Sequence, residues 1–253
     1  MIRTIYYFAV FLSFTFVAFL IFVVLWFVTV LFDRNRVVVH CFSRFWAKTI
    51  YRISPWWKIK LEGLENIEKG KSYIILSNHQ AMLDIPLLYY LPLDFKWISK
   101  KEVYYIPVFG WVLWMHGDIA IERGGVASAK KMMTDADKYL KRGVSVSIFP
   151  EGTRTKDGQV HEFHPGAFLM AKKSKVDVLP VVINGTFDAF GPKGGKTRIA
   201  APHTFTIKIM PAMPAAEVAK LRFNEICEKM ETTIRTEHQR IAPRFYNNTE
   251  SPA

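Results

Sequence analysis

The chain has 253 residues, half of them apolar and 22% charged, which excludes a disordered segment and a fibrous repeat. Its two cysteines, Cys41 and Cys227, are far apart and outside any CxxC pair, which argues against a disulfide scaffold and a thiolate metal site. The 34 basic and 22 acidic side chains give a formal charge of +12, which favours anionic partners. Because the basic residues form no run, we expect no nucleic-acid partner.

The stretch Ile5–Phe32 is almost unbroken in its apolar character and contains no charged residue. As one helix it would extend about 42 Å, more than the roughly 30 Å of a bilayer core, and it therefore predicts a membrane helix. A secretory signal peptide is the alternative, but its apolar region would be shorter and followed by small residues. Four basic residues follow the stretch: Arg34, Arg36, Arg44 and Lys48. By the positive-inside rule they place the bulk of the chain in the cytoplasm.

Residues 37–53 mix aromatic and basic side chains, a pattern typical of an amphipathic helix at the headgroup level or of a helix packed on the following domain. The two N-terminal segments could form a membrane span with a surface helix, or a helical hairpin held in one leaflet. The sequence Ser54-Pro55-Trp56-Trp57 ends the pattern. We therefore divide the chain into a membrane anchor with its interfacial helix, residues 1–57, and a second domain, residues 58–253.

From residue 58 onward, short β-rich runs alternate with helical stretches. The predicted strands are Tyr73–Ser77, Lys96–Ile98, Val144–Phe149, Val178–Ile183 and Phe205–Ile209. The predicted helices are Val126–Lys141, Pro165–Lys173 and Pro214–Ile241, and residues 187–203 predict a loop. This alternation predicts the α/β class, with a largely parallel central sheet flanked by helices on both faces.

A histidine and an aspartate directly follow the first of these strands, in the sequence Ser77-Asn78-His79-Gln80-Ala81-Met82-Leu83-Asp84. The carboxyl edge of an open α/β sheet is where functional sites gather. On a single helix the two side chains would point about 140° apart, so they meet only if the histidine lies in a turn before a helix. The carboxylate would then hold the Nδ1 proton and leave Nε2 free as a base. The alternative is a turn histidine followed by a helix-capping aspartate.

A second candidate, Phe149-Pro150-Glu151-Gly152-Thr153-Arg154, follows another apolar strand. The proline ends strand pairing and the glycine permits close backbone approach, so the arginine can offer its guanidinium to a phosphate. A surface turn with a Glu–Arg pair is the alternative. Two further basic candidates are Lys100, in the segment SKKEV, and Arg123, in the segment GDIAIER. The segment LPVVING at residues 179–185 predicts a buried strand.

In chain order these segments are HxxxxD, KKE, GDIAIER, FPEGTR and LPVVING. The series resembles the membrane-associated glycerophospholipid acyltransferases over about residues 58–211, and in pattern it is most similar to the 1-acylglycerol-3-phosphate acyltransferases. The resemblance implies that His79 is a general base and that Asp84 orients it. The substrate-binding residues that it implies are Lys100, Arg123, Glu151, Gly152, Thr153 and Arg154. Among these, Arg154 would be the main phosphate contact, and Glu122 stands where the family usually has aspartate before the Arg123 position.

The activity that this resemblance implies is transfer of a fatty acyl group from acyl-CoA or acyl carrier protein to the sn-2 hydroxyl of lysophosphatidate, giving phosphatidate for phospholipid biosynthesis. We expect no cofactor beyond this co-substrate, an anionic membrane lipid as a partner, and no metal, because His161 and His164 lack further ligands. Alternative acceptors are glycerol 3-phosphate and another lysophospholipid, and a membrane lipid-binding protein without activity is also open. A hydrolase would want a GxSxG nucleophile, which the sequence lacks.

Overall fold

A computed structural model of the chain describes residues 2–122, 126–190 and 201–247. Its central sheet confirms the predicted α/β class, since every strand pair is parallel except β6–β7. Within the described residues the strands lie in the order β1-β7-β6-β2-β5-β3-β4. Their bounds are β1 Trp57–Glu62, β2 Tyr73–Ser77, β3 Phe95–Lys100, β4 Ile119–Ile121, β5 Ser145–Ile148, β6 Asp177–Asn184 and β7 His203–Ile209.

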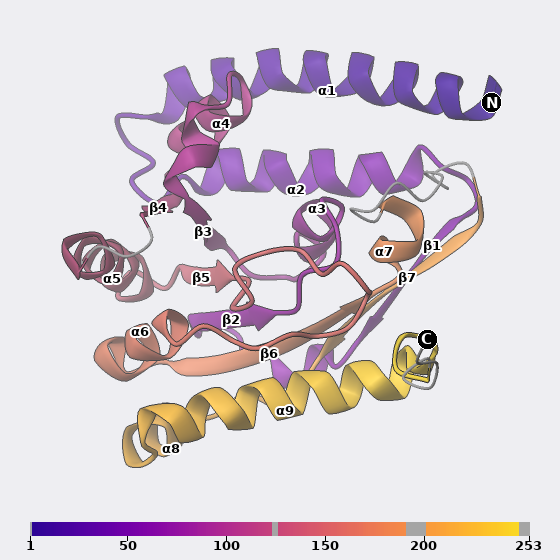
Figure 1. Cartoon of the computed structure of the whole chain (residues 1–253). Coiled ribbons are helices and arrows are strands. Elements are labelled where there is room, and N and C mark those ends of the chain that lie inside the picture. The colour runs from indigo at the N-terminus through magenta and orange to yellow at the C-terminus, as the bar shows by residue number, and fades with distance from the viewer. Residues whose placement is uncertain (1, 123–125, 191–200, 248–253) are drawn as a thin grey trace.

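Helices cover both faces of this sheet (Figure 1). The α-helices are α1 Ile2–Thr29, α2 Val37–Arg52, α3 Asp84–Leu88, α4 Phe109–His116, α5 Val126–Leu140, α6 Gly166–Ser174, α7 Thr186–Phe190, α8 Ala215–Lys220 and α9 Phe223–Ile241. The 3-10 helices are η1 Leu64–Asn66, η2 Lys101–Tyr105 and η3 Pro243–Phe245. The predicted helix Pro214–Ile241 is divided at Leu221 and Arg222, whose backbones are extended, and the predicted loop at 187–203 begins within α7.

Side-chain alternation along the strands builds a core on each face. In β2, Tyr73 and Ile75 pack toward α2, α3 and α7, whereas Ile74 and Leu76 pack toward α5, α6, α8 and α9. All four side chains are fully buried. A parallel strand that is buried on both faces has a continuous run of apolar residues in its sequence. For this reason β2, β5 and β6 could be predicted.

The N-terminal segments form a helical hairpin in which α1 runs antiparallel to α2, and α2 lies against the sheet (Figure 1). Trp46 Nε1 donates to Thr15 Oγ1 over 3.3 Å, and the Tyr7 ring lies 5.3 Å from the ring of Trp57. Between Ile5 and Thr29 the helix is long and apolar enough to anchor the chain in a membrane. The division at residue 57 stays a prediction, since α2 shares the core of the sheet.

Buried polar contacts fix α2 to the rest of the chain. His40 Nδ1 lies 3.2 Å from His116 Nε2, and His116 Nδ1 lies 2.8 Å from Asp118 Oδ1. Burial lowers the pKa of both imidazoles, so each is neutral near pH 7 and has one ring nitrogen able to accept a proton. On the same helix, Arg44 donates to Asp94 over 3.1 Å. The hairpin is therefore held at a defined position above the sheet.

Candidate active site

The turn after β2 brings His79 and Asp84 together. The Asn78 side chain bonds the backbone of Ile183 in β6 through both its amide oxygen and its amide nitrogen, which ends β2 and starts the turn. His79 lies in this turn and Asp84 is the first residue of α3. The His79 Nδ1 atom lies 2.7 Å from Asp84 Oδ2. The two side chains therefore meet in the arrangement that a general base needs.

Asp84 is completely buried and also caps the turn. Its Oδ2 atom accepts the backbone N–H groups of Gln80 and Ala81, besides the His79 imidazole. The alternative of a helix-capping aspartate is wrong, because these two N–H groups belong to the turn before α3 and no described side chain caps the start of that helix. Because a carboxylate only accepts hydrogen bonds, His79 Nδ1 carries the proton and Nε2 keeps its lone pair.

The His79 ring is held in orientation by an aromatic stack. It lies parallel to the Phe149 ring, with centroids 3.9 Å apart and planes inclined by 7°. Phe149 in turn stacks on Trp97 at 5.2 Å. No residue in the described part of the chain hydrogen-bonds to His79 Nε2, and the His79 side chain lines a cleft of about 950 Å³. Nε2 is therefore the ring nitrogen available to a ligand in this cleft.

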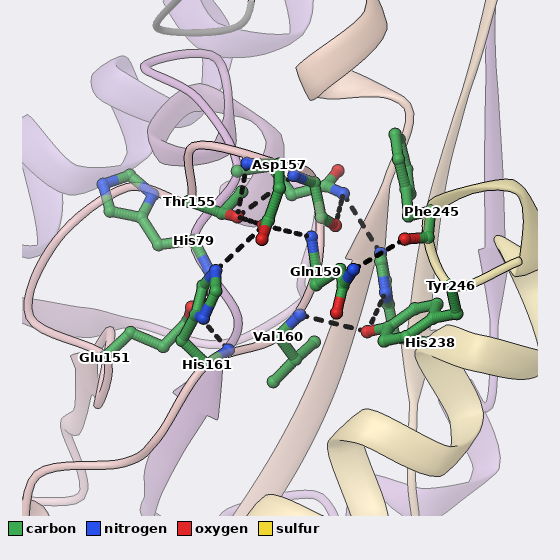
Figure 2. Close-up of polar contacts among 12 residues, drawn as sticks. His79, Glu151, Thr155, Asp157, Gln159, Val160, His161, His238, Phe245 and Tyr246 are labelled. Carbon is green, nitrogen blue, oxygen red and sulfur yellow. Dashed lines mark hydrogen bonds and ion pairs between the residues drawn. The ribbon is translucent and has the colours of Figure 1, made fainter. Parts of the chain in front are cut away.

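Glu151 joins the second motif to this turn (Figure 2). Its Oε1 atom accepts the backbone N–H of His79 over 2.8 Å, and Oε2 accepts that of His161 over 3.1 Å. The His79 carbonyl oxygen accepts the N–H of Thr155 over 2.9 Å. Burial raises the pKa of Glu151 to about 8, while the two N–H donors oppose the shift. Glu151 thus positions the His79 backbone, and the alternative of a Glu–Arg surface pair is wrong.

Arg154 and Lys100 line the same cleft as His79, together with Gly152 and Thr153. Arg154 is exposed, and neither it nor Lys100 forms an ion pair with any residue that the structure describes. The cleft therefore offers two cationic side chains to an anion. Gly152 adopts a positive φ of 65°, which favours glycine and turns the chain toward Arg154.

Arg123, one of the predicted phosphate-binding residues, lies outside the described residues. Its neighbour Glu122 lines the cleft and accepts a hydrogen bond from Lys101 over 3.1 Å. Apolar side chains form much of the remaining wall: Met82, Ile85, Trp97, Ile98, Val103, Ile106, Phe109, Leu113, Ile121, Met132, Ile148 and Phe149. The cleft thus combines a base, two cations and an apolar surface.

The described residues contain no group of three His, Cys, Asp or Glu side chains arranged to hold a metal ion. His161 Nε2 instead lies 2.9 Å from Asp157 Oδ1, and both side chains are about half exposed. The absence of a metal and of a cofactor stays an expectation.

The family model described as Acyltransferase matches residues 58–184, which include His79, Asp84, Lys100 and Arg154. The chain belongs to this acyltransferase family.

Curated relatives within the family are 1-acyl-sn-glycerol-3-phosphate acyltransferases. The chain is 40% identical to the chloroplastic enzyme of Arabidopsis thaliana over 62% of this chain and 44% of that protein. It is 33% identical to the enzyme of Pseudomonas aeruginosa over 83% of this chain and 80% of that protein. The chain spans about half the length of the first plant and algal relatives that it matches.

A solved structure extends this likeness to almost the whole fold. The crystal structure of the 1-acyl-sn-glycerophosphate acyltransferase PlsC from Thermotoga maritima superposes with a TM-score of 0.72 at 25% identity. The match covers 94% of this chain and 97% of that one. The likeness therefore includes the N-terminal helices, beyond the segment that the family model matches.

The second oxygen of the Asp84 carboxylate is hydrogen-bonded by Thr186. The Thr186 hydroxyl donates to Asp84 Oδ1, and its oxygen also lies 3.2 Å from Gln80 Oε1. Thr186 begins α7 directly after β6, the neighbour of β2 in the sheet. Sequence reasoning missed this residue. The signal that could have revealed it is its place after an apolar strand, at the same edge as His79.

Gln80 and His238 continue the contacts from this site toward the C-terminal segment. Gln80 Nε2 lies 3.0 Å from His238 Nε2, and His238 Nδ1 lies 2.9 Å from the Tyr246 hydroxyl. The Tyr246 hydroxyl oxygen accepts the N–H of Val160 (Figure 2). Helix α9 and the residues after it are therefore connected to the turn that carries His79.

Replacing Thr186 by valine should remove the Oδ1 donor with little change in shape. We expect kcat of the acyl transfer proposed below to fall about tenfold, the equivalent of one hydrogen bond to a charged group, with KM almost unchanged. The acid limb of kcat/KM should move to higher pH, because the less satisfied carboxylate holds the imidazolium more strongly. Thr186→Ser restores the hydroxyl and should restore both values. An unchanged kcat and pH profile in Thr186→Val would contradict this positioning role.

His238 should make stability depend on pH. Burial lowers its pKa to about 4, whereas an unfolded histidine has a pKa near its ordinary 6.5. Between these two pKa values only the unfolded chain protonates this histidine. The contribution of the buried, neutral His238 to the unfolding free energy is therefore complete above about pH 6.5 and is lost as the pH falls. When the pH is lowered from about 7 to about 5, the unfolding free energy of the unchanged chain should fall by up to about 2 kcal/mol more than that of the His238→Gln variant. Denaturant unfolding at both pH values measures this, and equal losses in the two proteins would contradict it.

Proposed function

We propose that the chain transfers a fatty acyl group from a thioester, acyl-CoA or acyl carrier protein, to the sn-2 hydroxyl of lysophosphatidate, giving phosphatidate. The observation that carries the proposal is that one cleft is lined by His79, which is paired with the buried Asp84, and by two cations without ion-pair partners among the described residues. The curated relatives named as 1-acyl-sn-glycerol-3-phosphate acyltransferases support this acceptor.

In the proposed reaction His79 is the general base. Its Nε2 takes the proton of the sn-2 hydroxyl while the oxygen attacks the thioester carbonyl carbon. When the tetrahedral intermediate collapses, the C–S bond breaks and the thiolate receives that proton from the imidazolium. Asp84 holds the Nδ1 proton and stabilises the transient positive charge on the ring. The proton thus passes from the hydroxyl to the thiol, and the enzyme is returned unchanged.

Arg154 and Lys100 are proposed to bind the phosphate of the acceptor. A guanidinium can form two parallel hydrogen bonds to phosphate oxygens, whereas an ammonium acts as a point charge. Gly152 and Thr153 shape the loop between Glu151 and Arg154, and Glu151 acts through the His79 backbone. Arg123 keeps its proposed phosphate role from the family pattern. Glycerol 3-phosphate carries the same phosphate, so it remains the alternative acceptor.

The apolar wall and the membrane helix fit a lipid acceptor. The sn-1 acyl chain of lysophosphatidate is costly to expose to water, so an enzyme held at the bilayer meets its substrate there. The positive-inside rule supports a catalytic domain on the cytoplasmic face. The net charge of +12 supports attraction to anionic lipid and to an acidic donor.

The purified chain should form phosphatidate from labelled acyl-CoA or acyl carrier protein and lysophosphatidate. His79→Gln should reduce kcat by about 10²- to 10⁴-fold, because the general base is lost. His161→Gln, which changes a half-exposed histidine on the Glu151 loop, is the matched control and should retain nearly full activity. Mass spectrometry of the products over a panel of acceptors measures both.

The same panel tests the phosphate site. Arg154→Ala should raise KM for lysophosphatidate at least tenfold and leave turnover of 1-acylglycerol, which has no phosphate, almost unchanged. Arg142→Ala, at an exposed arginine outside the cleft, is the control. No phosphatidate from lysophosphatidate, or a normal rate in His79→Gln, would overturn the proposed function.

A further inference from the structure

Outside the apolar helix α1, a second group of apolar side chains is exposed, on η2, on α4 and on the residues between them. We call this group the aromatic edge; its members are Tyr105, Ile106, Val108, Phe109, Trp111 and Trp114. The exposed fraction is 71% for Tyr105, 56% for Trp111 and 64% for Trp114, so most of each ring is uncovered. Contiguous exposed apolar surface of this kind marks a binding surface.

The aromatic edge is continuous with the outer surface of α1. The Trp114 ring lies 5.2 Å from the ring of Trp26, and the Trp111 ring lies 6.5 Å from that of Phe19. Figure 1 shows α4 rising from the sheet beside the C-terminal half of α1, on the side of the molecule away from α8 and α9. Whatever covers the outer surface of α1 therefore reaches the aromatic edge as well.

The chain holds the aromatic edge in a fixed shape. A Cβ atom at Gly110 would lie 2.0 Å from the carbonyl oxygen of Tyr104, so only glycine lets α4 pack so closely on η2. The N–H of Gly110 also donates to the Ile106 carbonyl oxygen over 2.8 Å. The exposed rings thus project from a packed unit and not from a loose loop.

Charge and position both favour a lipid surface as the occupant. The guanidinium of Arg36 lies 5.9 Å from the Trp26 ring centre, and Arg34 is exposed at the same end of α1. Basic and aromatic side chains beside an apolar surface are typical of protein at the headgroup layer of a membrane. Ile106 and Phe109 belong both to the edge and to the wall of the cleft that contains His79. The edge therefore borders the cleft.

We propose that the aromatic edge inserts into the headgroup layer of an anionic bilayer beside α1, as a second lipid contact that sets the mouth of the cleft at the membrane surface. The insertion itself does not depend on the reaction proposed above. A water-soluble protein partner could cover the aromatic edge only if it reached the surface beside α1, where α1 contacts lipid. A second copy of the chain would have to do the same. The experiment below distinguishes these two occupants from lipid.

The experiment places an environment-sensitive fluorophore at single cysteines in a Cys41→Ser, Cys227→Ser background. Tyr105→Cys carries the label on the aromatic edge, Phe16→Cys on the exposed side of α1, and Lys220→Cys at the end of α8. Each full-length protein is reconstituted into phosphatidylcholine–phosphatidylglycerol vesicles with or without lipids that carry a nitroxide near the headgroup. We expect strong quenching at positions 105 and 16 and none at position 220, and no catalysis is needed for this result.

Quenching at position 16 but not at position 105 would overturn the proposal, as would an absence of quenching at both. Self-quenching of the position 105 label that rises with protein concentration, without nitroxide quenching, would identify a second copy as the occupant and would overturn it too. As an independent test, the combined change Trp111→Ser, Trp114→Ser should weaken vesicle binding about tenfold, the loss of roughly 1.4 kcal/mol. Turnover of a short-chain, monomeric lysophosphatidate should stay unchanged, because neither tryptophan lines the cleft.

Discussion

The carboxylate of Asp84 is buried from water, and the surrounding fold supplies hydrogen-bond donors to both of its oxygens. One oxygen receives the His79 imidazole and two backbone N–H groups of the turn, and the other receives the Thr186 hydroxyl. A buried carboxylate without such donors would cost several kcal/mol. The donors come from the ends of two strands, so β2 and β6 must be neighbours for both oxygens of this carboxylate to be hydrogen-bonded.

The same constraint explains why so many contacts converge on one short turn. Asn78 ties the turn to β6, and Glu151 ties the His79 backbone to the loop that follows β5. Gln80 extends the contacts to His238 in α9. The carboxyl ends of three adjacent strands thus hold one imidazole, while the exposed Arg154 lies on a loop fixed by Glu151. Rigid support for the imidazole and an exposed cation suit the large anionic lipid that we propose as the acceptor.

Much of this arrangement could be predicted from the sequence, because strands buried on both faces are strongly apolar. The strands β2, β5 and β6 and the two motifs that follow them have this property. β1, the sequence Trp57-Lys58-Ile59-Lys60-Leu61-Glu62, alternates polar and apolar side chains at the edge of the sheet, and β4 has only three residues, so neither was recognised. The break between α8 and α9 was missed because both halves continue one helical pattern.

The partners of the site were harder to predict than its motifs. Thr186 contacts Asp84 only because β6 lies beside β2, and the order of strands in a sheet is a property of the whole fold. Glu151 had an obvious partner in sequence, Arg154, but burial turns its carboxylate toward the backbone N–H groups of His79 and His161. For Asp84 the sequence left two roles open, helix cap and histidine partner, and only the fold shows that its carboxylate turns back to His79 and to the N–H groups before α3.

Nitrogen NMR of the chain with ¹⁵N-labelled histidine tests most directly that Asp84 fixes the state of His79. The chain has seven histidines, and His79→Gln identifies the signal of interest. For the neutral form of the His79 imidazole, the account predicts the proton on Nδ1 and a free lone pair on Nε2. A His79 signal with the proton on Nε2, or one averaged between both tautomers, would contradict it.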